Sequence, residues 1–598
     1  MPRPLRHCET LGTLDRSIEK ATHHSHFIPS HHIEHHPSPA LPLFVQIFNM
    51  VSSDVAHCKN EESDEALDYK GKPIDKSKTG GWLAAGLILG AELAERICVQ
   101  GISLNLVTYL VGDLHISNSK SSTIVSNFLG SLNLLALFGG FLADAKLGRY
   151  LTVAIFSSVT ALGVIMFTIS TAIPSMKPPP CKDFRRSHNE CIEANGGQLT
   201  MLYVALYMIA LGGGGLKSSV SGFGSDQFDI MDPKEEKAMI FFFNRFYFCI
   251  SLGSLFGVTV LVYIQDNVAR AWGYGISAGA MTLAVIILLV GTKIYRYKKP
   301  KEAPSLFLDK AAVTEGIEAN NSNQWIVSTV TQVEEVKMVF KLIPIWSTCI
   351  LFWTVYSQMT TFSVEQATIM NRKIGSFVFP AGSLPVFLIV TILIFTSLNE
   401  KLLVPLSRKF THNPNGITSL QRIAIGLIFA IFAMVVAAIV EKHRRISSLK
   451  HKNMESVFWL VPQYFIVGAG EAFSYVGQLE FFIREAPERM KSMSTGLFLS
   501  TLAMGFFLSS LLVTIVDKVT HHGWIRNNLN NGRLDYFYWL LAVLGVFNFL
   551  AFLWFASKHQ YKVEQLNGFG SSNAKESELK GWNDGGLEEI EKKEGLDV

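Results

Sequence analysis

The sequence predicts an all-α membrane protein with twelve transmembrane helices in two pseudo-symmetric six-helix bundles. Of the 598 residues, 49% are hydrophobic and only 17% are charged, and the mean hydropathy is +0.27. Charge is also unevenly spread, because windows such as 150–172, 272–292 and 493–516 carry almost none. About 20 apolar residues in a helix cross the 30 Å hydrocarbon layer of a bilayer. A soluble multidomain protein would distribute its charges more evenly.

Twelve segments have the required length and apolar character, and about 46 mostly polar residues separate the sixth from the seventh. Six plus six with a central polar linker predicts two related bundles and a binding site between them near mid-membrane. The predicted spans are 82–108, 121–143, 150–172, 199–220, 239–264, 272–293, 340–363, 377–397, 421–440, 456–479, 493–516 and 536–556. The predicted regions are a disordered cytosolic arm (1–80), the N-terminal bundle (81–293), a cytosolic linker (294–339), the C-terminal bundle (340–557) and a disordered cytosolic tail (558–598).

Both ends of the chain are polar and of biased composition. The arm carries a His-rich stretch from His23 to His36, and such low complexity is more typical of a solvated, disordered segment than of a metal site. Met50 is a candidate start, so residues 1–49 are a candidate gene-model extension. Seven cysteines are too few for a disulfide scaffold. Cys181 and Cys191 share one polar loop and are a candidate disulfide if that loop faces an oxidising side.

Ionisable residues inside the predicted spans are the strongest functional signal. Glu92, Glu95 and Arg96 have i, i+3, i+4 spacing and share one face of the first span. Each such group costs about 2.5 to 3.5 kcal/mol at the bilayer centre. Static salt bridges between helices are one interpretation. Because buried ion pairs seldom stabilise more than apolar packing does, we favour carboxylates that change protonation state as part of the function.

Two further charges lie in opposite halves of the chain. Lys217 follows the glycine run Gly212–Gly215, and Glu471 follows Gly470. An ion pair between them could form and break as the halves rock, so we predict a gate there. Between the second and third spans, the segment from Gly140 to Arg149 is a tight loop with charges.

Four motifs resemble those of the proton-coupled oligopeptide transporter family of the major facilitator superfamily. They are Glu92-Leu-Ala-Glu-Arg96, the loop Gly140–Arg149, Phe223-Gly-Ser-Asp-Gln-Phe-Asp229 and Phe242-Phe-Asn-Arg245. The stretch from about 66 to 560 resembles the plant nitrate/peptide transporter family, nearest the branch that holds the dual-affinity nitrate transporter.

The resemblance implies a major facilitator fold with both termini cytosolic, proton symport across the plasma membrane, and no cofactor besides the proton. Each motif residue carries an implied role. Glu92, Glu95 and Arg96 couple protons to transport; Arg96, Lys217, Tyr356 and Glu471 bind substrate; Lys217 and Glu471 form an inter-bundle salt bridge; Gly140, Asp144, Gly148 and Arg149 form the loop signature; and Thr152 is a target of a protein kinase. A first-turn helix cap is the alternative role of Thr152.

Tyr356 departs from the pattern of the nitrate carrier, which has histidine at this position. A tyrosine hydroxyl offers an anion a neutral donor where a protonated histidine offers a charged one. We therefore expect a proton-coupled nitrate importer, and we keep other small organic anions, hormones, peptides, and a nitrate receptor with signalling output as alternatives. We expect no enzymatic activity, no metal and no nucleic-acid partner, and we leave a homodimer open.

Overall fold

The computed structural model describes residues 67–75, 78–181, 191–229, 232–298, 330–398, 409, 417–451, 454–485 and 491–559. The His-rich arm, most of the predicted linker and nearly all of the predicted tail lie outside these residues, so those predictions stay untested.

The described residues are mostly helical, and helices occupy each of the twelve predicted positions. The N-terminal half contains α3 (Gly81–Ser103), α4 (Leu106–Gly112), α5 (Asn118–Leu142), η1 (Ala143–Leu147), α6 (Arg149–Ala172), η2 (Pro174–Met176), α8 (Gly196–Ser225), α9 (Pro233–Phe256), η3 (Gly257–Leu261), α10 (Val262–Asn267), α11 (Arg270–Val290) and η4 (Gly291–Lys293). The C-terminal half contains α12 (Val330–Thr360), α13 (Phe362–Thr368), β1 (Lys373–Ile374), β2 (Phe377–Val378), η5 (Ala381–Ser383), α14 (Pro385–Leu398), α16 (Ser419–Ile446), η7 (Ser447–His451), η8 (Val457–Leu460), α17 (Val461–Glu485), α18 (Lys491–Val519) and α19 (Leu534–Lys558).

Among the described residues, nine helices are long and apolar enough to cross a membrane. Helices α3, α14 and α17 occupy the other three predicted spans. Helix α3 carries three charged residues, α14 has only 14 residues, and the 25-residue α17 contains Glu471. The all-α membrane fold is confirmed.

The predicted start of the eighth span at residue 377 is wrong. An antiparallel hairpin pairs β1 with β2 there, and the helix begins only at Pro385. Gly375 in the hairpin turn has φ 62°, a left-handed conformation that favours glycine. The first span also breaks, since Leu104 and Asn105 separate α3 from α4.

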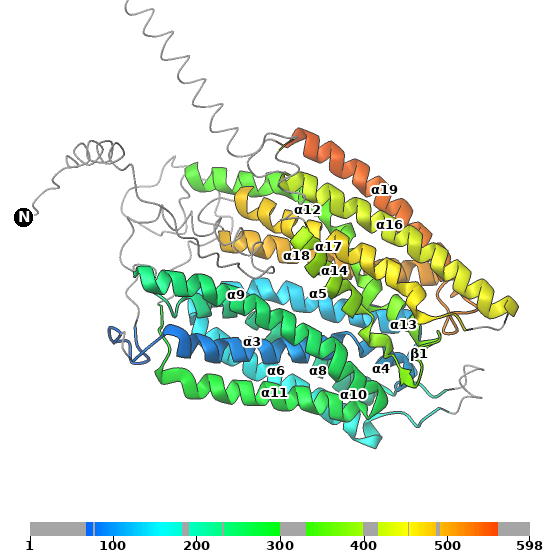
Figure 1. The fold of residues 1–598 in the computed structure, drawn as a ribbon, viewed down its shortest axis with the longest axis horizontal. Coiled ribbons are helices and arrows are strands. Elements are labelled where there is room, and N and C mark those ends of the chain that lie inside the picture. Colours follow the sequence, from blue (N-terminus) through cyan, green and yellow to red (C-terminus); the bar gives the residue numbers. More distant parts are fainter. Residues whose placement is uncertain are drawn as a thin grey trace, which may run out of the picture. The chain divides into compact units, whose positions relative to one another are not determined.

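Within each half the helices pack against one another. In the N-terminal half α8 packs on α5 and α6, and α3 packs on α9 and α11; in the C-terminal half α17 packs on α14 and α16, and α12 packs on α18 and α19. Contact between the halves runs mainly along α5 and α18, with α4 against α13 at one end (Figure 1).

The glycine run Gly212–Gly215 explains how α8 lies so close to its neighbours. A Cβ on Gly214 would be 2.7 Å from the carbonyl oxygen of Leu132 on α5. Small residues of this kind permit close helix packing within a membrane. This packing places Lys217, one turn further along α8, next to α5 and α3.

Candidate functional site

The charged cluster of α3 is buried and paired within its own helix. The Nε atom of Arg96 lies 2.8 Å from Oε1 of Glu92 and 3.0 Å from Oε2 of Glu95. The side chains of Glu92 and Glu95 are 1% and 0% exposed, whereas Arg96 is 16% exposed. The structure therefore brings the three predicted residues together, with the arginine as their most accessible member.

Glu95 is held differently from Glu92. Arg96 donates a hydrogen bond to Glu92, but the contact with Glu95 lacks hydrogen-bond geometry, and both carboxylate oxygens of Glu95 are buried without a hydrogen-bond partner. Its Oε1 lies 3.6 Å from where a Cβ on Gly213 of α8 would be. A buried carboxylate held only by ionic attraction is costly in its charged form, so Glu95 is the better candidate to take up a proton.

Lys217 on α8 has a partner that the sequence analysis missed. Its Nζ donates to Oδ1 of Asn133 on α5 at 2.8 Å. Asn133 is buried and lies inside the predicted second span. The span holds several other polar residues, such as Ser126, Asn127 and Ser131, so its sequence does not single out Asn133.

The predicted ion pair between Lys217 and Glu471 is not formed in this structure. Lys217 contacts Asn133 instead, and Oε2 of Glu471 is buried without a hydrogen-bond partner. The two residues come from opposite halves, so their separation depends on how the halves are arranged. The pairing stays a prediction for another arrangement of the halves.

In the C-terminal half, aromatic side chains around Tyr356 form what we call the aromatic wall. Tyr356 on α12 packs edge-on against Trp353, with ring centroids 5.6 Å apart, and against Phe506 at 6.3 Å. Trp353 also packs edge-on against Tyr475 of α17, with ring centroids 6.2 Å apart. The aromatic rings around Tyr356 therefore join α12 to α17 and α18.

The loop signature ties the third helix to the fourth. Gly148 has φ 76°, which favours glycine, and it begins the turn into α6. Nη1 of Arg149 lies 2.9 Å from both carboxylate oxygens of Asp226 and donates to the carbonyl of Gly222 at 3.3 Å. Gly140 is at the end of α5, and the side chain of Asp144 lies outside the described part of the chain. The arrangement holds the ends of α6 and α8 together.

Thr152 is fully buried, at 0% exposed. Its hydroxyl donates to the carbonyl of Gly148 at 2.9 Å, and the residue capping α6 is Gly148, so the alternative role of Thr152 as a cap is wrong. A kinase can reach this hydroxyl only if the start of α6 opens, and phosphorylation stays a prediction.

The loop between α6 and α8 carries a disulfide between Cys181 and Cys191, whose Cα atoms are 5.6 Å apart. The loop is fastened to the segment before α5, because Nδ1 of His115 lies 2.9 Å from the carbonyl of Ile192. We call the side of the molecule that carries this loop the disulfide-loop end.

The POT family model, described as "PTR2: POT family", matches residues 150–312 and 301–529 of this chain. The chain belongs to the POT family of transporters. Protein NRT1/PTR FAMILY 6.4 of Arabidopsis thaliana is 64% identical over 562 residues, which cover 86% of this chain and 95% of that protein. Protein NRT1/PTR FAMILY 6.3 of the same plant is 48% identical over 84% of this chain and 95% of its own length.

Solved POT structures have the same fold. An auto-inhibited POT family peptide transporter aligns with TM-score 0.64 and 19% identity, over 80% of this chain and 97% of its own. The POT family transporter PepTSo aligns with TM-score 0.63, over 80% of this chain and 98% of its own. The predicted family and the major facilitator type of fold are confirmed, and so is the expectation that the protein is a transporter rather than an enzyme.

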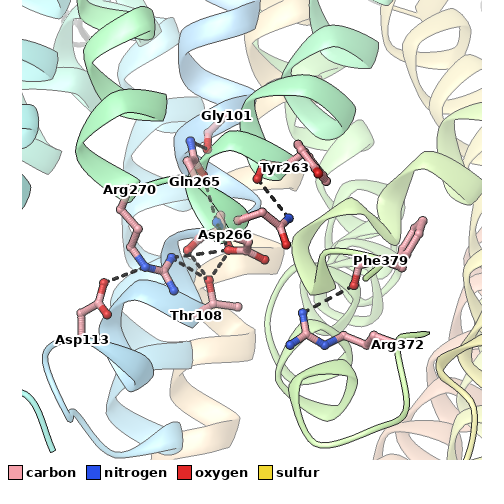
Figure 2. A network of polar contacts seen from close by, with 11 residues as sticks. Gly101, Thr108, Asp113, Tyr263, Gln265, Asp266, Arg270, Arg372 and Phe379 are labelled. Atoms are coloured by element: carbon pink, nitrogen blue, oxygen red, sulfur yellow. Dashed lines mark hydrogen bonds and ion pairs between the residues drawn. The ribbon is translucent and has the colours of Figure 1, made fainter. Parts of the chain in front are cut away.

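In this POT family protein the disulfide-loop end of the N-terminal half contains a dense polar network, drawn in Figure 2. Nε of Arg270, the first residue of α11, lies 2.6 Å from Oδ2 of Asp113. Asn105, at the break between α3 and α4, donates to Oε1 of Gln265 at 3.0 Å and to Oδ1 of Asp266 at 2.8 Å. The network fastens the broken first helix to α10 and α11.

Hydrogen bonds between the halves also lie toward the disulfide-loop end. Asn118 at the start of α5 donates to the carbonyls of Arg526 and Asn527 at 3.1 and 3.2 Å. Ser383 of η5 donates to the carbonyl of Val258 at 2.7 Å. The two halves are therefore closed on one another at this end.

Proposed function

We propose that this transporter is a proton-coupled symporter that imports nitrate across the plasma membrane by alternating access. The observation that supports the proposal is the charge balance around Arg96. Glu92, Glu95, Arg96 and Lys217 sum to zero when all are ionised, and one proton on Glu95 leaves the cluster with a single positive charge. A positive site away from water attracts a monovalent anion strongly, so proton binding and anion binding favour each other.

The coupling step uses the two contacts of Arg96. While both carboxylates are charged, they hold the guanidinium at 2.8 and 3.0 Å. A proton on Glu95 removes one attraction, and Arg96, already 16% exposed, becomes available to an anion. The proton and the anion then cross together as a neutral pair, which lowers the cost of moving charge through the bilayer.

The disulfide supports an orientation for the proposed importer. Disulfides persist on the oxidising side of a membrane, and Cys181–Cys191 lies at the end opposite the central linker, since the connections alternate between the two sides. In the proposed orientation the disulfide loop is outside and the termini are cytosolic. In that orientation the contacts between the halves at the disulfide-loop end close the outer side.

A peptide or another substrate with an amino group is the second candidate, and one observation favours it. The buried Oε2 of Glu471 lacks a hydrogen-bond partner, and a substrate ammonium would satisfy it. Nitrate would instead require Glu471 to be neutral or paired with Lys217. Organic anions and hormones differ from nitrate mainly in size, which the aromatic wall around Tyr356 would have to accommodate.

The test is nitrate uptake by the full-length protein in proteoliposomes at external pH 5.5 and 7.5. We expect acid-stimulated uptake that Glu95→Gln and Arg96→Ala reduce at least tenfold. Glu193→Gln is the matched control, because Glu193 is an exposed loop carboxylate paired with Lys120 at 3.5 Å. Uptake in Glu95→Gln equal to that of the unaltered protein would refute the coupling role. Nitrate uptake at background level, together with saturable uptake of a dipeptide, would replace nitrate by the second candidate.

A further inference from the structure

We propose that Asn133 is a positioning residue that holds Lys217 inside the N-terminal half while the disulfide-loop end is closed, and that Lys217 leaves Asn133 for Glu471 when the halves rearrange. This inference rests on the proposed function and deepens it, because it gives Lys217, the lysine of the predicted gate, a neutral partner besides Glu471. It rests on the contacts of three residues and on their place in the fold.

Two hydrogen bonds orient the side-chain amide of Asn133, one that it donates and one that it accepts. Its Nδ2 donates to the carbonyl of Leu129, one turn earlier in α5, at 2.9 Å. The oxygen of the amide therefore points away from its own helix, and it accepts from Nζ of Lys217 at 2.8 Å. The bond to Leu129 uses one of the two Nδ2 hydrogens and fixes the amide so that its oxygen, an acceptor suited to an ammonium group, meets Lys217.

Asn133 lies on the face of α5 that meets the other half. Ser126, two turns earlier, has its hydroxyl oxygen 3.0 Å from that of Ser357 on α12. A Cβ on Gly130, one turn earlier, would lie 2.9 Å from the ring of Phe507 on α18. Residues spaced by three, four and seven share a helix face. A movement of the halves along α5 therefore changes the surroundings of Asn133 directly.

The two arrangements differ in which partner of Lys217 is bonded. Each arrangement satisfies either Asn133 or Glu471 and leaves the other without Lys217. In the closed arrangement Lys217 has Asn133, while Oε2 of Glu471 is buried without a partner. In the rearranged state Lys217 would neutralise Glu471 and free the oxygen of Asn133. A hydrogen bond to a charged group contributes enough to change an equilibrium by about tenfold, so loss of the Asn133 contact should shift the population away from the closed arrangement.

The experiment measures that population without any substrate. Ser126→Cys and Ser357→Cys place two thiols at a contact that belongs to the closed arrangement, and the rate of oxidative cross-linking in membranes reports how often it forms. We expect Asn133→Ala to lower this rate about threefold to tenfold. We expect Asn133→Asp, which replaces the neutral acceptor by a charged one, to keep the rate at least equal to that of the parent. Asn548→Ala is the matched control, because Asn548 of α19 donates to the carbonyl of Thr348 at 2.8 Å, far from Lys217 in the chain, and no charged group accepts or donates in that bond.

A background of Lys217→Met, which removes the donor and keeps an unbranched side chain, separates positioning from packing. If Asn133 acts through Lys217, adding Asn133→Ala to Lys217→Met leaves the cross-linking rate unchanged. Equal losses in Asn133→Ala and Asn133→Asp, an unchanged rate in Asn133→Ala alone, or a further loss in the Lys217→Met background would each overturn the proposal. Because the readout needs neither nitrate nor a proton gradient, a failed uptake assay leaves this test intact, and a failed cross-linking test leaves nitrate symport standing.

Discussion

The two halves of the protein hold their intramembrane charges in opposite ways. In the N-terminal half Arg96 is paired with Glu92 at 2.8 Å, and Lys217 is bonded to Asn133 at 2.8 Å. In the C-terminal half Glu471 keeps a buried oxygen without a hydrogen-bond partner. The N-terminal half pairs its charges internally, since even Glu95, whose oxygens lack a hydrogen bond, has Arg96 at 3.0 Å. Among the described residues Glu471 has no such ion-pair partner in its own half.

Away from mid-membrane the halves are alike. Arg149 at the start of α6 pairs with Asp226 beyond the end of α8 at 2.9 Å. Arg422 at the start of α16 pairs with Glu480 near the end of α17 at 3.0 Å. The first ion pair joins α6 to the end of α8, and the second joins α16 to α17. These are the third and fourth membrane helices of each half, so both halves contain an equivalent ion pair, which we call the anchor pair. The asymmetry is therefore confined to the region that we propose carries transport.

The largest expected effect comes from removing the charges that distinguish the halves. Lys217→Ala leaves Glu92, Glu95 and Arg96 with a net negative charge, so nitrate uptake should fall more than tenfold. Glu471→Gln removes the partner that Lys217 needs in the rearranged state but keeps the positive cluster. We expect its kcat to fall severalfold with little change in KM, measured as initial uptake over a range of nitrate concentrations.

The exchanged pair Lys217→Glu with Glu471→Lys sharpens this prediction. It restores an opposite-charge pair while placing the lysine in the C-terminal half. If only the pair matters, the double variant should recover part of the lost uptake. If the positive charge must lie beside Arg96, it should stay inactive, which is what the asymmetry predicts. Full recovery would show that the halves are interchangeable.

A smaller effect separates packing from charge within α8. Gly213 and Gly214 are adjacent, but a Cβ on Gly213 would meet its nearest neighbours at 3.5 and 3.6 Å, while one on Gly214 would lie 2.7 Å from the Leu132 carbonyl. Gly214→Ala should therefore lower the free energy of unfolding by about 1 to 3 kcal/mol. Gly213→Ala should cost much less and change uptake only through its contact with Glu95. Thermal unfolding in detergent measures both, and equal losses of stability would contradict the described packing.

The sequence predicted the fold and the charged cluster well, for physical reasons. Apolar length determines where helices cross a bilayer, and i, i+3, i+4 spacing places Glu92, Glu95 and Arg96 on one face whatever surrounds them. The helix start at 385 was missed because residues 377–384 are apolar enough to resemble a span, although Pro380 and Pro385 flank a short 3-10 turn.

The contacts of Lys217 could not be predicted from the sequence. Asn133 lies 84 positions away, and its partner depends on how α5 and α8 cross, which the glycine run permits but does not specify. Whether Lys217 meets Asn133 or Glu471 depends further on the arrangement of the halves. The burial of Thr152 was missed for a similar reason, since its exposure depends on the neighbours of α6 rather than on the motif that precedes it.

The smallest expected effect concerns a charge pair at the linker end of the N-terminal half, outside the membrane-spanning segments. Nη1 of Arg296 donates to Oε2 of Glu235 at 2.6 Å, and the backbone N–H of Asp229 donates to the same oxygen at 2.6 Å. The bond from the Arg296 side chain holds the pKa of Glu235 below its ordinary value of 4.5. Because the pKa is lower in the folded protein than in the unfolded chain, the stabilisation is present above about pH 4.5 and is lost as the pH falls through the folded value.

Glu235→Gln should therefore lower the free energy of unfolding by about 1 kcal/mol at pH 7, since the side chain of Glu235 is 23% exposed and solvent weakens the pair. The difference from the unaltered protein should shrink when thermal unfolding is repeated below pH 4.5, and nitrate uptake at pH 5.5 should be unchanged. A stability difference that is the same at every pH would mean that Glu235 acts by packing. A loss of uptake would mean that the Arg296–Glu235 ion pair also takes part in transport. Structural ion pairs near the membrane surface would then no longer differ in role from the charges around Arg96.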